Sequence, residues 1–173
     1  MDSEYFTLWL TGRPCSGKTT IAEALERKLR DEGLPVAHLD GDDVRKGLCS
    51  DLGFSKEDRN ENLRRIGHVS KLFNRKGNYV LASFVSPLEE YREMLDGIID
   101  NFKLVYVNAP LEECIKRDVK GMYAKALKGE MKGFTGIGKN APFEEPKKAD
   151  LVVYTDREKL EESVERVYGR FFG

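Results

Sequence analysis

The chain has few of the features that mark special classes of protein. Its three cysteines, Cys15, Cys49 and Cys114, show no C-x-x-C spacing, which disfavours a disulfide framework or a zinc site and fits a reducing cytoplasm. No apolar run approaches membrane-spanning length, and the first residues lack the basic and apolar regions of a signal peptide. Lys and Arg total 29 against 30 Asp and Glu, so no global basic field favours nucleic acid. We therefore expect a soluble cytoplasmic protein that binds neither membranes nor nucleic acid.

The 173 residues suffice for one domain with a substantial core. Apolar runs predict strands at residues 6–10, 36–39, 79–82, 104–107 and 151–154. Amphipathic stretches predict helices at residues 18–32, 58–76, 89–100 and 111–118, and from residue 157 onward. The strands are continuously apolar rather than alternating, which is typical of a parallel sheet covered on both faces. We predict a single α/β domain over residues 1–173, with a five-stranded, mostly parallel sheet and helices on both faces.

A complete phosphate-binding motif follows the first expected strand. Residues 12–19 match G-x-x-x-x-G-K-[ST], and helix-forming sequence continues from there. A strand before the loop and a helix after it let backbone N–H groups surround a phosphate at the positive end of the helix, so a chance Gly-rich turn is the weaker alternative. Lys18 can reach the β- and γ-phosphates, and the Thr19 hydroxyl can hold Mg²⁺. The expected nucleotide contacts are Gly12, Arg13, Pro14, Cys15, Ser16, Gly17, Lys18, Thr19 and Thr20.

Two carboxylates separated by one glycine, Asp40 and Asp42, end the second expected strand. Because ligands gather where parallel strands end, both would lie near Lys18. One carboxylate can orient or deprotonate an acceptor hydroxyl, and the other can hold water around Mg²⁺. Thr19 and Asp40 are therefore the candidate metal residues. A simple helix cap or turn residue is the alternative, and Asp43 fits that role for a short turn at residues 44–48.

The longest expected helix carries polar residues on its apolar face. Its apolar stripe extends back to Arg59 and Asn62, so these side chains would face inward. A buried guanidinium needs an anionic partner, because leaving it unpaired costs about 3–5 kcal/mol. We infer an anionic ligand, on which Arg45 would also converge. An internal salt bridge to Asp51 or Glu61 is the alternative.

The segment from residue 120 to residue 148 interrupts the alternation of strands and helices. Five glycines, at positions 121, 129, 133, 136 and 138, punctuate it. Its lysines are Lys120, Lys125, Lys128, Lys132, Lys139, Lys147 and Lys148. A long basic segment of this kind favours a mobile lid over phosphates, with a solvated surface loop as the alternative.

Several other residues allow two interpretations. Phe54 and Phe134 lie in Gly-flanked polar segments, where a ring either packs on a flat group such as a base or anchors its loop in the core. His38 and His68 have no partner at metal-ligand spacing, so we expect both to be structural. Arg117, with the Asp that follows it, either caps a helix or touches the nucleotide.

Together these segments resemble the adenylyl-sulfate kinase family of P-loop kinases, from residue 7 to about residue 155. The resemblance rests on LDGDDVRKGL (residues 39–48), DLGFS (51–55), DRNEN (58–62), SFVSP (83–87), RD (117–118), KGMY (120–123) and FTGI (134–137). It implies phosphorylation of adenylyl sulfate on its 3′-hydroxyl by ATP with Mg²⁺, giving 3′-phosphoadenylyl sulfate in sulfate activation. It also implies a homodimer.

The resemblance further implies roles for individual residues. Asp42 would be the base or orienting group for the 3′-hydroxyl, with Asp40 beside it and Lys120 near the transferring phosphates. Arg117 would border the ATP adenine. Ser86 corresponds to a serine proposed in this family as a phosphorylated intermediate, although in-line transfer needs no such intermediate and a positioning role is the alternative. The implied contacts to adenylyl sulfate are Asp42, Arg45, Phe54, Arg59, Asn62, Val85, Ser86, Lys120, Phe134 and Ile137.

The chain departs from the family pattern at a few positions. Glu89 stands where Arg is usual, Val119 replaces a usual Pro, His68 replaces a Glu, and residues 13–16 are atypical. These departures bear on substrate affinity and lid stiffness more than on the class of reaction. The alternatives to this function are a kinase for a sugar or shikimate-like acceptor and a nucleotide-dependent switch. No Asn-Lys-x-Asp string supports a GTPase switch.

Overall fold

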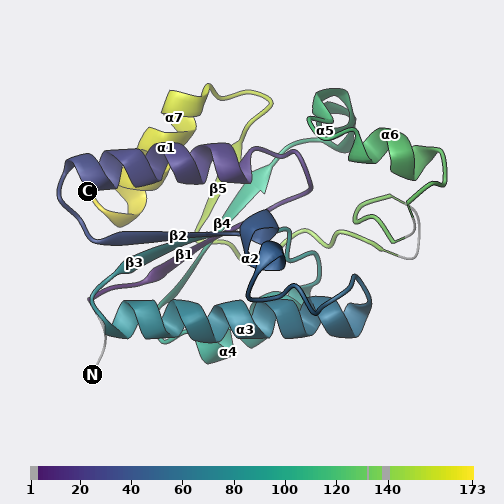
Figure 1. The fold of residues 1–173 in the computed structure, drawn as a ribbon. Coiled ribbons are helices and arrows are strands. Elements are labelled where there is room, and N and C mark those ends of the chain that lie inside the picture. The colour runs from purple at the N-terminus through teal and green to yellow at the C-terminus, as the bar shows by residue number, and fades with distance from the viewer. Residues whose placement is uncertain (1–3, 132, 138–140) are drawn as a thin grey trace.

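The computed structural model describes residues 4–131, 133–137 and 141–173. Its strands form one sheet in the order β2-β3-β1-β4-β5, and every neighbouring pair is parallel (Figure 1). The strands are β1 (Thr7–Thr11), β2 (Val36–Asp40), β3 (Tyr79–Ser83), β4 (Phe102–Asn108) and β5 (Leu151–Tyr154). The first strand therefore lies at the centre, and the loop that follows it emerges in the middle of the carboxyl edge.

Helices cover both faces of the sheet, as Figure 1 shows. On one face lie α1 (Lys18–Asp31) and α7 (Leu160–Phe171), and on the other lie α3 (Lys56–Arg75) and α4 (Glu89–Ile98). Three short helices, α2 (Gly41–Lys46), α5 (Leu111–Arg117) and α6 (Met122–Leu127), follow the carboxyl ends of β2 and β4. Within the described ranges, no helix combines the length and the apolar character needed to cross a bilayer.

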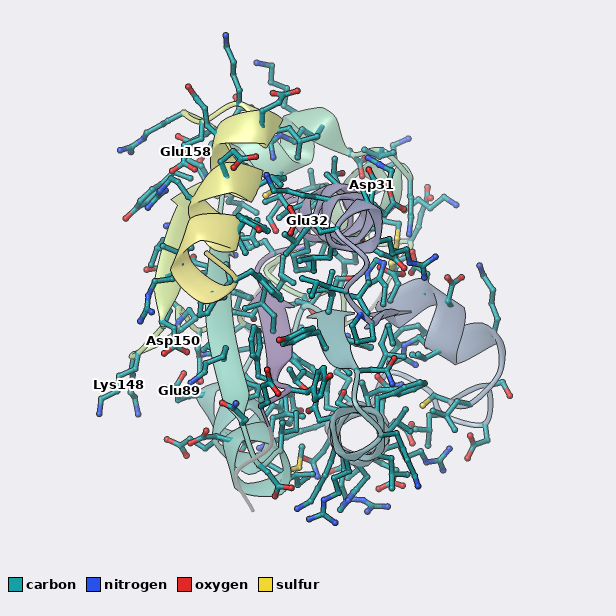
Figure 2. The ribbon with its side chains drawn as sticks, turned by 90° about the vertical axis from the view of Figure 1, so that its left-hand side faces the viewer. Asp31, Glu32, Glu89, Lys148, Asp150 and Glu158 are labelled. Carbon is teal, nitrogen blue, oxygen red and sulfur yellow. The ribbon has the colours of Figure 1, made fainter. Side chains whose placement is uncertain are left out.

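The core consists of two layers, one on each side of the sheet, and side chains fill both (Figure 2). In β1, Leu8 and Leu10 pack under α1 and α7, whereas Trp9 faces α3 and α4. Successive residues of a strand point to opposite faces, and both faces are covered here, so the three consecutive residues Leu8, Trp9 and Leu10 are all apolar. This confirms the predicted α/β fold with a parallel sheet.

The predicted ranges agree with the structure to within two residues at each end, except that the last helix begins at Leu160 rather than at residue 157. Two short helices were not predicted. The helix α2 occupies the expected turn, and α6 lies inside the expected lid. Tyr123 of α6 and Phe134 are buried with Cys114 in a third apolar cluster, so much of that segment is packed rather than loose. The predicted lid residues Lys132, Gly138 and Lys139 lie outside the described residues.

Candidate active site

The phosphate loop lies between β1 and α1, as predicted. A side chain at Gly12 would place its Cβ 2.4 Å from the Val107 carbonyl oxygen, and Gly17 has a φ of 103°, so both positions require glycine. The Lys18 ammonium group donates hydrogen bonds to the carbonyl oxygens of Gly12 (3.0 Å) and Arg13 (2.8 Å). Burial lowers the pKa of Lys18 to about 8. Because these hydrogen bonds hold the ammonium group over the loop, an anion bound there would favour its charged form.

Asp40 connects the end of β2 to the start of α1. Its Oδ2 accepts hydrogen bonds from the hydroxyls of Thr19 (2.8 Å) and Ser83 (2.9 Å). Its Oδ1 accepts from the Asp42 N–H (2.9 Å), so Asp40 also caps α2. Burial acts to raise the pKa of Asp40, but these three hydrogen bonds outweigh it and hold the pKa below its usual value. Asp40 thus caps α2 and is also a candidate metal residue. The Thr19 hydroxyl beside its ionised carboxylate suits a hard cation such as Mg²⁺.

Asp42 follows in the first turn of α2, and its carboxylate forms an ion pair with Lys120 from the loop after α5. The Asp42 side chain is 64% exposed and the Lys120 side chain 56%. These two predicted site residues are therefore brought together, and both remain open to a ligand.

Two guanidinium groups lie against one exposed aromatic ring. Those of Arg45 and Arg59 lie 4.4 and 5.8 Å from the ring centroid of Phe54, which is 65% exposed. Arg59 also donates to the carbonyl oxygen of Gly133 (2.7 Å) and the hydroxyl of Thr135 (2.6 Å). Partial burial, and then the nearby charge of Arg45, lowers the pKa of Arg59 below its usual value. Two adjacent positive charges attract an anion.

The alternative of an internal salt bridge from Arg59 is wrong for the carboxylates that we considered. Asp51 pairs with Arg65 at 2.7 Å, and Glu61 pairs with Arg64 (2.7 Å) and Arg65 (3.0 Å). In the described part of the chain, no carboxylate lies within 4.0 Å of the guanidinium group of Arg45 or Arg59. Both charges are therefore available to a ligand.

Asn62 faces inward, as its place on the apolar stripe predicted, and is 4% exposed. No described residue accepts a hydrogen bond from its side-chain nitrogen. A buried donor without a partner costs about 1–3 kcal/mol, so this amide is suited to a ligand contact.

Phe134 differs from Phe54, because its ring is buried and lies 4.8 Å from that of Tyr123 at an angle of 79°. In this structure Phe134 therefore anchors its loop in the core, which is one of the two interpretations that the sequence allowed. Ile137 packs against the same cluster. The Val85 carbonyl oxygen accepts a hydrogen bond from the Thr11 hydroxyl (2.8 Å), which joins the end of β1 to the turn after β3.

Ser86 has a left-handed backbone, with a φ of 37°, and is 2% exposed. Its Oγ accepts a hydrogen bond from Trp9 Nε1 (3.1 Å) and donates one to Thr11 Oγ1 (2.8 Å). The hydroxyl is therefore engaged inside the protein, directly beneath the start of the phosphate loop. This geometry suits a positioning role better than a nucleophile, which must be exposed to the phosphate.

Arg117 braces the phosphate loop. Its guanidinium group donates to the carbonyl oxygens of Cys15 (3.3 Å), Ser16 (3.4 Å) and Thr155 (2.7 Å). The Asp118 carboxylate accepts from two N–H groups in the first turn of α6, so it caps the helix that follows and not α5, the helix that we expected it to cap. Sequence reasoning missed Thr155, although its place directly after β5 was a usable signal.

Sequence reasoning also missed two polar residues behind Asp40. His38, which we expected to be structural, lies 2.9 Å from the Ser83 hydroxyl, which in turn donates to Asp40. Spacing along the chain gives no sign of this arrangement, because the end of β2 at Asp40 and the start of β3 at Tyr79 are 39 residues apart.

The phosphate loop follows the central strand β1, and Asp40 ends β2, which lies beyond β3 in the sheet. This arrangement defines a P-loop kinase. The sequence model of the adenylylsulphate kinase family matches residues 4–154, and the chain belongs to that family. It is 52% identical over 168 residues to a probable adenylyl-sulfate kinase of Synechocystis, covering 97% of this chain and 94% of the relative. The APS kinase of Mycobacterium tuberculosis, solved in complex with AMPPNP and APS, superposes with a TM-score of 0.92 at 41% identity over 98% of each chain.

Kinases for other acceptors are more distant. A sugar kinase from Janibacter superposes with a TM-score of 0.64 at 20% identity, over 95% of this chain and 93% of that one, which shows a shared fold alone. Membership of the adenylylsulphate kinase family therefore decides against the sugar-kinase and switch alternatives.

Proposed function

We propose that this chain transfers the γ-phosphoryl group of ATP to the 3′-hydroxyl of adenylyl sulfate (APS), giving 3′-phosphoadenylyl sulfate and ADP for sulfate activation. The observation that carries the proposal is the pair of uncompensated guanidinium groups around the exposed Phe54 ring, next to Asp42. A neutral sugar would not need two such charges, whereas a nucleotide offers both a phosphosulfate and a base. The relative from M. tuberculosis, which binds AMPPNP and APS, supports this assignment.

The phosphate loop and Arg117 form the ATP half of the site. The loop N–H groups and Lys18 bind the phosphates, and Arg117 borders the adenine beside Thr155. Thr19 and Asp40 would hold Mg²⁺, because the Thr19 hydroxyl and the ionised Asp40 carboxylate lie 2.8 Å apart. Bound Mg²⁺ neutralises charge on the phosphate oxygens.

The acceptor half is built around α2 and the first turns of α3. Arg45, Arg59 and Asn62 bind the phosphosulfate, and the exposed face of Phe54 stacks on the adenine. Phe134 borders that base from the segment which Arg59 holds through Gly133 and Thr135. Backbone groups of Val85 and Ile137 complete this pocket.

Asp42 orients the 3′-hydroxyl and accepts its proton. The 3′-oxygen then forms a bond to the γ-phosphorus as the bond to the β-phosphate oxygen breaks, and ADP leaves. Lys120, which pairs with Asp42 here, stabilises the charge on the transferring group. Ser86 holds the turn beneath the loop rather than carrying the phosphoryl group. The described parts of the segment at residues 120–148 act as the lid over both substrates.

We further propose that the domain works as one unit, in the cytoplasm and as a homodimer, as the family resemblance implies. Its three cysteines are free thiols, which suits a reducing compartment.

The function is tested by measuring ADP and 3′-phosphoadenylyl sulfate with ATP and a panel of acceptors: APS, AMP, gluconate and shikimate. Turnover with APS alone is the expected result, and equal turnover with shikimate or gluconate would refute the assignment. Arg59→Gln should raise the KM for APS by roughly 10- to 100-fold, because it removes a charged hydrogen-bond donor. Arg64→Gln, an exposed change on the same helix, should leave the KM within about twofold of the original value.

A further inference from the structure

A network of polar side chains links α1, β2 and β3 beside the candidate metal position. On α1, Thr19 and Glu26 are seven residues apart, about two helical turns, so both lie on the same side of the helix. On β2, His38 and Asp40 are two residues apart and share one face. Thr19 meets Asp40 at 2.8 Å, and Glu26 meets the His38 Nδ1 at 3.5 Å. Two polar contacts thus join α1 to β2.

Ser83 of β3 joins the two contacts, because it lies opposite Asp40 in the β2–β3 register. Its hydroxyl donates to Asp40 Oδ2 at 2.9 Å, and the His38 Nε2 lies 2.9 Å from the same hydroxyl oxygen. A hydroxyl has one proton, and here it goes to a carboxylate that can only accept. The His38 Nε2 must therefore carry a proton and donate it to Ser83. The donors in this network are therefore assigned: His38 donates to Ser83, and Ser83 donates to Asp40.

Burial strengthens the hydrogen bonds between His38, Ser83 and Asp40. Ser83 is 3% exposed and the His38 side chain 11%. Hydrogen bonds in such surroundings are stronger than in water, and each one polarises the next. Without the His38 donor, the Ser83 hydroxyl could turn its proton to another acceptor. Asp40 would then lose one of the three donors that fix its carboxylate.

We propose that His38 is a positioning residue for the phosphoryl-transfer site, acting through Ser83 to hold the Asp40 carboxylate against the Thr19 hydroxyl. This inference rests on the proposed function to the extent that Thr19 and Asp40 hold the Mg²⁺ of the nucleotide complex. His38 itself contacts no substrate. Its effect is expected in the part of nucleotide affinity that depends on Mg²⁺, because the phosphate loop keeps its own contacts.

The test is calorimetric titration of the full chain with ADP and with ATP, in Mg²⁺ and in EDTA. His38→Leu should weaken binding in Mg²⁺ about five- to tenfold and leave binding in EDTA unchanged. His38→Gln keeps an N–H donor at the end of its side chain and should recover most of the loss. The control is His68→Leu, the same change on an exposed position of α3, which should bind as the original protein does.

Ser83→Ala removes the hydroxyl that links His38 to Asp40 and should reproduce the Mg²⁺-specific loss of affinity. The double variant should then be no weaker than Ser83→Ala alone, since both changes break one pathway. The inference is overturned if His38→Leu matches the His68 control, if the loss is equal in EDTA, or if the two losses multiply. If His38→Leu does not fold, His38→Ala, which also removes the donor to Ser83, is titrated in its place and judged by the same criteria. None of these titrations contains APS, so they remain informative even if the acceptor assignment fails.

Discussion

Lys120 and Asp42 form an ion pair between two segments that are distant in sequence, the loop after α5 and the first turn of α2. Both side chains are more than half exposed, so the contact adds little stability, and its significance lies in where it places the two charges. The pair brings the Lys120 ammonium group to the carboxylate of Asp42, the residue proposed to accept the 3′-hydroxyl proton.

Lys120→Ala should lower kcat about 10- to 100-fold, because it removes a charge that stabilises the transferring phosphoryl group. ATP affinity should change little, since among the described residues the Lys120 ammonium group pairs with Asp42 and makes no hydrogen bond to the phosphate loop. Steady-state kinetics together with ATP titration separate the two quantities. Lys116→Ala, a similar loss of an exposed lysine on α5, is the control and should retain full activity.

Asp42→Asn should lower kcat about 100-fold or more, because an amide cannot accept the 3′-hydroxyl proton. Its side chain makes no hydrogen bond to the phosphate loop among the described contacts, so ATP binding should be largely kept. Titration with ATP and single-turnover measurement of product are the required assays. A loss of ATP affinity that matches the loss of kcat would contradict the assigned role.

Lys18→Ala should abolish turnover and weaken ATP binding, because the Lys18 ammonium group lies on the phosphate loop, where it donates to the carbonyl oxygens of Gly12 and Arg13. Cys15→Ala is the matched control within the same loop, since its carbonyl oxygen and not its thiol holds Arg117. It should retain ATP binding. Measurable turnover by Lys18→Ala would show that another group binds the γ-phosphate.

Nucleotide binding should take up a proton at alkaline pH. Burial lowers the pKa of Lys18 to about 8 in the free protein, and phosphate contact raises it. Below this pKa the lysine is already charged, so binding takes up no proton there. As pH rises above about 8 the free protein loses the proton, and affinity should fall. The nucleotide phosphates stay ionised throughout, since their last pKa is about 6. Titration of ADP at pH 7 and pH 9, in buffers of different ionisation enthalpy, measures the uptake. Equal values at the two pH values would contradict this prediction.

The local parts of this site were predictable from the sequence, and the parts that depend on distant contacts were not. The phosphate loop and Asp40 follow from strand ends and fixed spacing. In contrast, α6 begins after Gly121 in a glycine-rich segment, where composition favours a loop. It forms because Asp118 caps it and because the Tyr123 hydroxyl donates to the Pro14 carbonyl oxygen, 109 residues away.

Phe134 shows the same limit in another way. Its polar, Gly-flanked surroundings are compatible with an exposed ring and with a buried one, and it is buried because it packs against Tyr123 and the rest of the third apolar cluster. The inward direction of Asn62, on the other hand, followed from helical periodicity alone. Periodicity determines which face a residue lies on, whereas the partner it meets there depends on the packing of the whole chain.

Arg92 is a buried guanidinium, 3% exposed, that joins the turn containing Ser86 to the end of the basic segment. It donates to the carbonyl oxygens of Ser86 (2.8 Å) and Glu144 (2.8 Å) and pairs with Glu89 at 2.6 Å. The Glu144 carboxylate in turn accepts the Glu89 N–H at 2.8 Å. Glu89 lies on the side of the molecule that also carries Lys148 and Asp150 (Figure 2). Glu89 is therefore paired within the chain.

Arg92→Met should destabilise the fold by about 3 kcal/mol, because it leaves Glu89 without its partner and two carbonyl groups without a donor. Glu89→Gln keeps a hydrogen-bond acceptor for Arg92 and should have a smaller effect, about 1–2 kcal/mol. Arg75→Met, which breaks an exposed ion pair with Asp100, is the control and should change the free energy of unfolding by less than about 1 kcal/mol. Urea midpoints of the three variants give the comparison. If Arg92→Met unfolds at the same urea concentration as Arg75→Met, the buried pair does not hold the turn and the basic segment together.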